Sequence, residues 1–224
     1  TLTLNNDGSF SYLHDGSENF TDSFTYRAND GTANGNIATV SFAIAPVADT
    51  NEPIVGTEGP DMLNGTLLND SMLGAGGNDT LTGSGGNDTL EGGLGNDTLY
   101  GDSSFSGMNV GNDILNGGNG NDGLIGGTGI DTFIGGLGDD AFEVTDANEK
   151  ITEYIGEGSD TVVTNLKSFT LAPVTATPEL ENLSLFGTAQ IGIGNEIGNS
   201  ISGWSNNNTL FGMAGNDIIT DATG

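Results

Sequence analysis

Apolar residues recur at every ninth position between residues 56 and 143. Written in rows of nine, this stretch begins GTEGPDMLN, GTLLNDSML, GAGGNDTLT, GSGGNDTLE and GGLGNDTLY, and it ends GGNGNDGLI, GGTGIDTFI and GGLGDDAFE. The row between these blocks, GDSSFSGMNVGNDILN, carries seven extra residues. The eighth position is apolar in all nine rows: Leu63, Met72, Leu81, Leu90, Leu99, Leu115, Leu124, Phe133 and Phe142. This period predicts a six-residue turn and a three-residue strand, whose eighth-position side chain points inward.

Glycine recurs at the first, second and fourth positions of these rows, where it permits dihedral angles and close approaches that a Cβ would block. Two rows then complete one coil of a right-handed spiral, and successive coils stack at ~4.8 Å like neighbouring strands. The sequence therefore predicts an all-β fold whose interior is a thin column of Leu and Phe side chains.

The sixth position of every row is aspartate. Stacking aligns each aspartate with the one two rows later, which divides them between two rims of the spiral. The first rim carries Asp61, Asp79, Asp97, Asp122 and Asp140. The second rim carries Asp70, Asp88, Asp113 and Asp131. Carboxylates ~5 Å apart repel by several kcal/mol at a low effective dielectric constant, so the stack needs a counter-ion.

The net charge of the whole chain also indicates that the fold needs bound cations. The chain holds 31 Asp and Glu against 3 Lys and Arg, a net charge of −28, and 39 of its 224 residues are glycine. Carboxylates and inward-pointing turn carbonyls, without nitrogen or sulfur, form the ligand set that Ca²⁺ prefers; Mg²⁺ is the weaker match because it needs a smaller octahedron and keeps its waters. Several bound calcium ions are the expected cofactors.

These rows resemble the repeats-in-toxin (RTX) family of haemolysin-type calcium-binding nonapeptides. The resemblance implies a parallel β-roll, one Ca²⁺ shared between turns two rows apart, and export by a type I secretion system. Besides the aspartates of both rims, the candidate ligands are turn residues at the first and third positions: Gly74, Gly76, Gly83, Gly85, Gly92, Leu94, Gly117, Asn119, Gly126 and Thr128. Rows one and two depart from the pattern, with Pro60 before the aspartate and Leu68 at the fourth position, so Asp61 and Asp70 are the weakest candidates.

A second, degenerate array covers residues 194–224, in rows GNEIGNSIS, GWSNNNTLF and GMAGNDIIT. Only Asp217 keeps the acid, while Asn199 and Asn208 stand in the equivalent places. We expect the roll to continue here with one calcium site and with side-chain amide ladders in the asparagine turns. The chain ends shortly after Asp221, so we expect the family's C-terminal export signal to be missing.

Residues 144–193 lose the nine-residue period and carry alternating segments, TVVTNL at 161–166 and ENLSLFG at 181–187. Glu153, Glu157 and Asp160 cluster in this region. We expect β-strands that continue or cap the roll, with a discrete ligand pocket as the alternative.

Residues 1–48 alternate apolar and polar positions with Asn-Asp-Gly turn signals, which predicts strands at about 1–4, 9–13, 23–28 and 37–44. DGSFSYL, TDSFTYRANDG and the tail PVADTNEP resemble the C-terminal half of cadherin-like or VCBS-type domains of bacterial surface proteins. The resemblance implies a partial antiparallel β-sandwich with one uncovered apolar face, followed by a linker at 49–55. In that family the linker acids bind calcium, which makes Asp49, Asn51 and Glu52 candidates, with a plain polar tether as the alternative.

Composition excludes several functions. Phosphate binding needs clustered Lys and Arg, but the chain has only Arg27, Lys150 and Lys167, so nucleic acid is not a partner. The absence of cysteine excludes disulfides and thiol chemistry. No apolar run reaches the ~18 residues of a membrane span. His14 has no Ser and acid constellation around it, so we do not expect an enzyme.

We therefore expect a monomeric calcium-binding module of an extracellular bacterial adhesin or similar secreted protein, which folds when it binds calcium. The opening residues TLTLNNDGSF carry no Met or signal-peptide pattern, as in a fragment of a longer chain. The alternatives are a carbohydrate-binding module acting through the loop at 103–110 or Trp204, an accessory region of a secreted enzyme, and an ice-binding roll that displays its fifth-position asparagines. A carbohydrate or a host-cell surface ligand would then be a further partner.

Overall fold

The computed structural model describes residues 2–4, 10–12, 21–29, 32–43, 53–103, 111–171, 180–204 and 207–221. All regular elements in these ranges are β-strands. Within them, no helix has the length and apolar character needed to cross a membrane. The chain divides into two compact units, Thr1–Val47 and Ala48–Gly224.

The N-terminal unit consists of two antiparallel strand pairs. Strand β1 (Leu2–Leu4) pairs with β2 (Phe10–Tyr12), and β3 (Thr21–Asn29) pairs with β4 (Asn34–Ala43). These elements agree with the four predicted strands and with a partial antiparallel sandwich. Tyr26 on β3 is 51% exposed, as expected for a sheet with an uncovered face.

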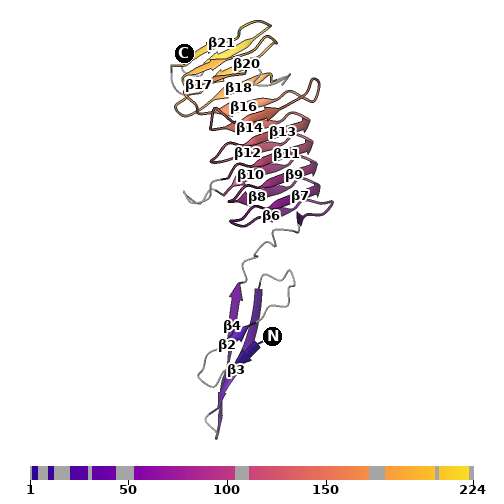
Figure 1. Ribbon diagram of the computed structural model, residues 1–224, viewed down its shortest axis with the longest axis vertical. Helices are drawn as coiled ribbons and strands as arrows, with labels where there is room; N and C mark the ends of the chain where they lie inside the picture. The colour runs from indigo at the N-terminus through magenta and orange to yellow at the C-terminus, as the bar shows by residue number, and fades with distance from the viewer. Residues whose placement is uncertain are drawn as a thin grey trace. The chain divides into compact units, whose positions relative to one another are not determined.

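The second unit is a parallel β-roll, in which strands from alternate rows form opposite sheets (Figure 1). The larger sheet has nine strands: β6 (Met62–Asn64), β8 (Thr80–Ser84), β10 (Thr98–Asp102), β12 (Gly123–Ile125), β14 (Ala141–Val144), β16 (Thr161–Thr164), β18 (Asn182–Leu185), β20 (Ser200–Gly203) and β22 (Ile218–Asp221). A six-stranded sheet contains β5 (Ile54–Val55), β7 (Ser71–Gly76), β9 (Thr89–Leu94), β11 (Ile114–Asn119), β13 (Thr132–Leu137) and β15 (Lys150–Thr152). The remaining sheet contains β17 (Ser168–Thr170), β19 (Ile191–Ile193) and β21 (Thr209–Phe211).

The register confirms that two rows make one coil. Leu99 on β10 lies opposite Leu81 on β8 and opposite Leu124 on β12, so each eighth-position side chain stacks on the one two rows away. The seven extra residues of the interrupted row do not disturb this register, because β11 still pairs with β9 and with β13.

Most strands of the repeats have four to six residues and are longer than the three that the period predicts, whereas β6 and β12 have the predicted length. Strand β7 runs from the seventh position of one row to the third position of the next, and its residues alternate between partly or fully exposed and buried. The predicted length was wrong for the six strands of five or six residues, because in each of them the first-position glycine continues the extended strand. Because this glycine has no side chain, it can face the interior without displacing the apolar side chains.

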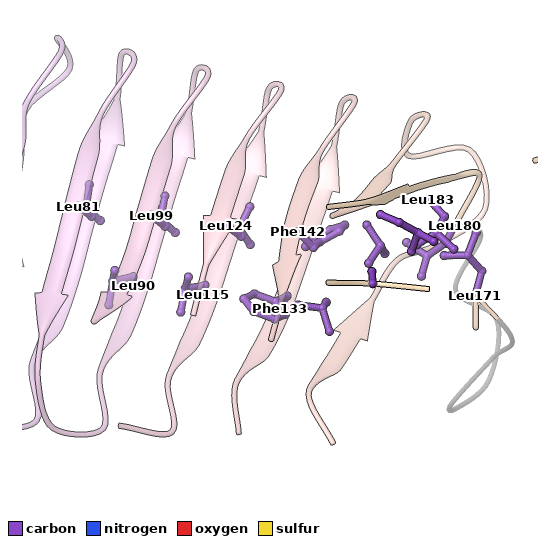
Figure 2. Packing of buried hydrophobic residues seen from close by; sticks show 14 of the residues in the cluster. Leu81, Leu90, Leu99, Leu115, Leu124, Phe133, Phe142, Leu171, Leu180 and Leu183 are labelled. Atoms are coloured by element: carbon purple, nitrogen blue, oxygen red, sulfur yellow. The ribbon is translucent and has the colours of Figure 1, made fainter. Parts of the chain in front are cut away.

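The core is a single column of eighth-position side chains from the two facing sheets. Figure 2 shows Leu81, Leu99, Leu124 and Phe142 from one sheet approaching Leu90, Leu115 and Phe133 from the other, and all seven are fully buried. The rings of Phe133 and Phe142 lie 6.0 Å apart between centroids, at an interplanar angle of 52°. Since a fully buried Leu or Phe contributes about 1.5–3 kcal/mol, this narrow core leaves much of the stability to other interactions.

The region without the nine-residue period continues the roll, as expected. Val162 on β16 lies opposite Phe142, and Leu183 on β18 lies opposite Val162. Leu183 in turn faces Ile201 on β20, so the buried column passes without a break into the degenerate array. Ile219 on β22 keeps the register but is 48% exposed.

Candidate metal sites on the rims of the roll

The sixth-position aspartates form two hydrogen-bonded ladders along the roll. On the first rim, the backbone N–H of each aspartate donates to Oδ1 of the aspartate in the next coil, at 2.7–2.8 Å for the steps Asp61 to Asp79, Asp79 to Asp97, Asp97 to Asp122 and Asp122 to Asp140. The second rim repeats the contact at 2.8–2.9 Å for the steps Asp70 to Asp88, Asp88 to Asp113 and Asp113 to Asp131. The structure thus brings together the rows that the repeat spacing aligns.

The second carboxylate oxygen of these residues is buried and has no hydrogen-bond partner. This holds for Oδ2 of seven aspartates: Asp79, Asp88, Asp97, Asp113, Asp122, Asp131 and Asp140. A buried acceptor without a partner costs about 1–3 kcal/mol, and more when it is charged. Lys150 and Lys167, the only basic residues of this unit, are exposed. The ladders therefore leave a row of oxygens that need a cation.

The first-position glycines mark where such a cation would lie. A Cβ built on Gly74 would clash with Oδ2 of Asp79 and with the carbonyl oxygen of Gly92 from the next coil. Likewise, a Cβ built on Gly92 would clash with Oδ2 of Asp97 and with the carbonyl oxygen of Gly117. A carboxylate oxygen and a backbone carbonyl thus converge beside each glycine, and only glycine leaves this space free.

All five first-position candidates present their carbonyl oxygens in this way, each toward the glycine of the preceding coil: Gly74, Gly83, Gly92, Gly117 and Gly126.

The third-position candidates differ. The carbonyls of Leu94 and Asn119 accept backbone hydrogen bonds of 2.8 Å from Gly77 and Gly95 of the preceding coil. Gly76 and Gly85 are buried, whereas Thr128 is exposed and donates to Asp102. The carbonyls of Leu94 and Asn119 thus join neighbouring coils, a structural role that the spacing does not reveal.

The first two rows have a different kind of turn. Thr57 donates its backbone N–H (2.6 Å) and its hydroxyl (2.9 Å) to Oδ2 of Asp61. Thr66 makes the same two contacts to Asp70, at 2.6 and 3.0 Å. Because threonine satisfies Oδ2 in both turns, Asp61 and Asp70 lack the unpartnered oxygen of the later rows, and they remain the weakest candidates.

Burial raises the pKa of six rim carboxyls above the ordinary aspartate value. The pKa rises to about 7 for Asp113 and Asp140 and to about 6 for Asp88 and Asp122. Loss of solvation is the main cause in each case, and repulsion between neighbouring carboxylates adds to it. The hydrogen bond from the preceding backbone N–H lowers the pKa but does not compensate. The pKa values of Asp97 and Asp131 are raised for the same main reason.

An asparagine turn satisfies itself without a cation. The Nδ2 group of Asn199 donates to the carbonyls of Leu180 (3.3 Å) and Glu181 (3.2 Å) and to Oδ1 of Asn195 (3.0 Å). Its backbone N–H donates to Oδ1 of Asp217 at 2.9 Å, which continues the ladder geometry.

The other two turns of the degenerate array differ from this one. Asn208 donates to the carbonyl of Ala189, although its own buried Oδ1 is unpartnered. Asp217 also approaches Gly212 as in the glycine turns.

The fifth-position asparagines form further ladders outside the aspartates. The backbone N–H of Asn112 donates to Oδ1 of Asn87 at 2.9 Å, and Oδ1 of Asn112 accepts from Ile130 at 2.8 Å. Asn78, Asn96 and Asn121 are linked in the same way on the other rim. Asparagine at this position therefore holds the coils together, a role that the sequence analysis missed.

Four further acids belong to the rims although their positions break the repeat. Asp102 carries a buried, unpartnered Oδ1, and its charge raises the pKa of Asp88, Asp113 and Asp131. Glu149, Glu153 and Asp160 are buried in the region without the period. Loss of solvation raises the pKa of Glu149 to about 7 and that of Glu153 to about 8. The nine-residue alignment could not identify them because the turns that carry them have other lengths or residue types.

Asp49, Asn51, Glu52 and His14 lie outside the described residues, as does the loop at 104–110. Trp204, the other position considered for carbohydrate, is 71% exposed. None of the interactions described above involves it.

The geometry defines a class of protein: a parallel β-roll whose rims present oxygen ligands suited to hard divalent cations. Carboxylate and carbonyl oxygens are the donor set of Ca²⁺, and the unpartnered Oδ2 atoms beside the glycines fit it.

The chain carries four copies of the RTX calcium-binding nonapeptide repeat, at residues 48–81, 73–104, 120–143 and 193–220. Residues 1–43 match a bacterial Ig domain. Comparison with curated proteins finds no match.

Proposed function

We propose that this chain is the calcium-binding part of an exported bacterial protein and that calcium drives the folding of its roll. The supporting observation is the row of seven buried Oδ2 atoms that have no hydrogen-bond partner. RTX repeats bind calcium, so the match to these repeats supports the choice of ion. The residues that would hold the ions are the glycine-turn aspartates and the first-position carbonyls of the adjoining coil.

The energetics favour folding coupled to calcium. Without a cation, folding buries repelling carboxylates around a narrow apolar column. A site with free calcium at ten times its dissociation constant stabilises the folded chain by about 1.4 kcal/mol. Five such sites would contribute about 7 kcal/mol, which is comparable to the whole stability of an ordinary domain.

The affinity range supports a role outside the cell. Extracellular calcium modules have dissociation constants of about 10⁻⁴–10⁻³ M, so they stay empty at cytosolic calcium concentrations. A chain of this kind would pass through an export channel unfolded and would fold at millimolar calcium. Type I secretion and a place in a surface adhesin fit this sequence of events, since RTX repeats and bacterial Ig domains are typical of exported proteins.

We infer binding rather than catalysis for this part of the protein. The buried carboxylates of the rims already accept backbone hydrogen bonds, and acids committed to calcium are poor proton shuttles. The RTX repeats of the chain support a structural role.

The test is a calcium titration of the metal-free chain, followed by circular dichroism, with Mg²⁺ in a parallel titration. We expect a cooperative gain of β-structure with Ca²⁺ and a much weaker response to Mg²⁺. A chain that keeps its spectrum and its thermal midpoint in excess chelator would overturn calcium-coupled folding. A chain that binds no calcium by equilibrium dialysis would overturn the function itself.

A further inference from the structure

The coil that follows the last regular row replaces a glycine with a glutamate. The register of β13 and β15 places Thr152 opposite Ile134, so the next residue, Glu153, aligns with Gly135. Every complete row has glycine at this first position. Glu153 therefore brings a carboxylate to a place where the repeats offer only a backbone carbonyl.

The carboxylate of Glu153 points into the rim. Its Oε1 accepts a hydrogen bond of 2.8 Å from the backbone N–H of Gly135. Its Oε2 is buried and has no hydrogen-bond partner, and the residue is 1% exposed. A Cβ built on Gly135 would clash with Oε1 of Glu153 and with Oδ2 of Asp140, so both carboxylates border the same space.

Asp160 completes the group. Its Oδ1 accepts the backbone N–H of Asp140 at 2.8 Å, which extends the first-rim ladder beyond the repeats. Asp140, Glu153 and Asp160 each offer one carboxylate oxygen, and these atoms lie within 4.8 Å of one another. All three residues are buried, and Oδ2 of Asp140 is also unpartnered.

The neighbouring acids Asp139, Glu157 and Glu181 do not belong to this buried group, since Asp139 is exposed and the other two are partly exposed. Each of them accepts a backbone hydrogen bond of its own. Asp139 accepts one from Ser159, Glu157 accepts one from Tyr154 and Glu181 accepts one from Asp160, all at 2.8–2.9 Å. Lys150, the basic residue nearest in sequence, is exposed. The cluster therefore gathers three carboxylates of which two carry an unpartnered, buried oxygen.

We propose that Asp140, in the last nonapeptide row, joins Glu153 and Asp160, which lie beyond the rows, in a calcium site that binds its ion more tightly than the sites within the rows. This inference rests on the proposed calcium-binding function. The number of charged ligands sets the affinity of an all-oxygen site for Ca²⁺, and three carboxylates exceed the single converging carboxylate beside Gly74 or Gly92. The first ion to bind would then fix the coil in which the regular repeat ends.

The test compares calcium binding to the full chain and to two variants, by equilibrium dialysis and by competition with a chromophoric chelator. Glu153→Gln keeps an oxygen that can accept from Gly135 but removes the charge. Glu143→Gln is the matched control, because Glu143 lies on β14 of the same coil and is partly exposed. We expect Glu153→Gln to weaken the tightest step, one ion per chain, by at least about tenfold, and Glu143→Gln to leave it unchanged.

A second readout separates a ligand from a structural hydrogen-bond acceptor. Without metal, Glu153→Gln relieves repulsion and should raise the thermal midpoint, whereas with saturating calcium it should lower the midpoint relative to the unsubstituted chain. An unchanged number and affinity of bound ions would overturn the site. If Glu153→Gln does not fold at any calcium concentration, calcium-dependent folding by Glu153→Asp supports the site, and failure of both variants overturns it.

The same measurements distinguish this inference from the proposed function. An unsubstituted chain that binds no calcium rejects both. A chain that binds calcium through its repeats, while Glu153→Gln binds as tightly as the unsubstituted chain, rejects only the site at Glu153.

Discussion

Oδ1 of Asp97 accepts a hydrogen bond of 2.7 Å from the backbone N–H of Asp79, which precedes it by 18 residues, while Oδ2 of Asp97 is buried without a partner. The two oxygens of one carboxylate thus have different roles. One joins neighbouring coils, and the other faces the space beside a first-position glycine. The two roles can be separated by substitution.

Asp97→Asn and Asp97→Ala should have different effects. Asparagine keeps an oxygen that accepts from Asp79 but lowers the charge of the site, so we expect a higher calcium midpoint and little loss of metal-free stability. Alanine also leaves the N–H of Asp79 without an acceptor, which costs about 1–3 kcal/mol more. Calcium titration followed by circular dichroism and thermal unfolding at saturating calcium measure the two effects.

Asp61→Ala is the control for these variants. Asp61 lies in the first row and its Oδ2 is already satisfied by Thr57, so its removal should shift the calcium midpoint less than Asp97→Ala does. Equal shifts for the two alanine variants would contradict the distinction between threonine turns and glycine turns.

Gly92→Ala should block one site without changing any charge. The added Cβ would occupy the space that Oδ2 of Asp97 and the carbonyl of Gly117 border. We expect fewer bound ions and a higher calcium midpoint. Calorimetric titration with calcium provides both numbers.

Gly123→Ala is the matched substitution for Gly92→Ala. Gly123 is a seventh-position residue whose Cβ would meet nothing closer than 3.9 Å, and Ala141 stands at the equivalent place in a later row. Calcium binding should be unaffected. A loss as large as that of Gly92→Ala would mean that alanine acts through strand propensity and not through the site.

The nine-residue period was sufficient to predict the parallel roll, the buried eighth positions and the pairing of aspartates two rows apart. It failed where the contacts depend on atoms that the period does not specify. The hydroxyls of Thr57 and Thr66 satisfy carboxylates that look equivalent to the others. Glu153 was noted only as part of an acidic cluster, because its role follows from the register of β13 and β15 rather than from a motif.

The metal-free chain should become more stable as the pH falls. The pKa of Asp113 and Asp140 is raised to about 7, and that of Glu153 to about 8, chiefly by loss of solvation. A carboxyl with a higher pKa in the folded chain than in the unfolded chain binds its proton more tightly when folded, so protonation favours folding. This stabilisation is complete below the ordinary aspartate value of 3.8 and is lost as the pH rises through about 7 to 8.

Circular dichroism of the chain, freed of metal by a chelating resin, measures this dependence between pH 4 and 8. We expect β-structure to decrease as the pH approaches 8, and added calcium to restore it at neutral pH. Calcium affinity should fall in acid, since protons compete for the same oxygens. A metal-free chain with the same spectrum and thermal midpoint at pH 5 and pH 8 would contradict the burial of these carboxyls.

Asn199→Asp should convert a coil that needs no cation into one that does. The Nδ2 group of Asn199 donates to the carbonyls of Leu180 and Glu181 and to Oδ1 of Asn195, so an amide N–H₂ occupies the place that a cation would otherwise take among these oxygens. Aspartate removes these donors and adds a buried negative charge. We expect a lower thermal midpoint in chelator and at least partial recovery in millimolar calcium.

Asn165→Asp makes the same change of charge at an exposed position and serves as the control. Its thermal midpoint should respond to calcium as that of the unsubstituted chain does. If Asn199→Asp were equally unaffected in chelator, the donors of Asn199 would contribute nothing to the stability of its coil. If calcium failed to recover any of the lost stability, the oxygens around residue 199 could not act as ligands, because the substitution supplies the carboxylate that the glycine turns use. Recovery by calcium but not by magnesium would show that a single amide replaces the ion in this part of the roll.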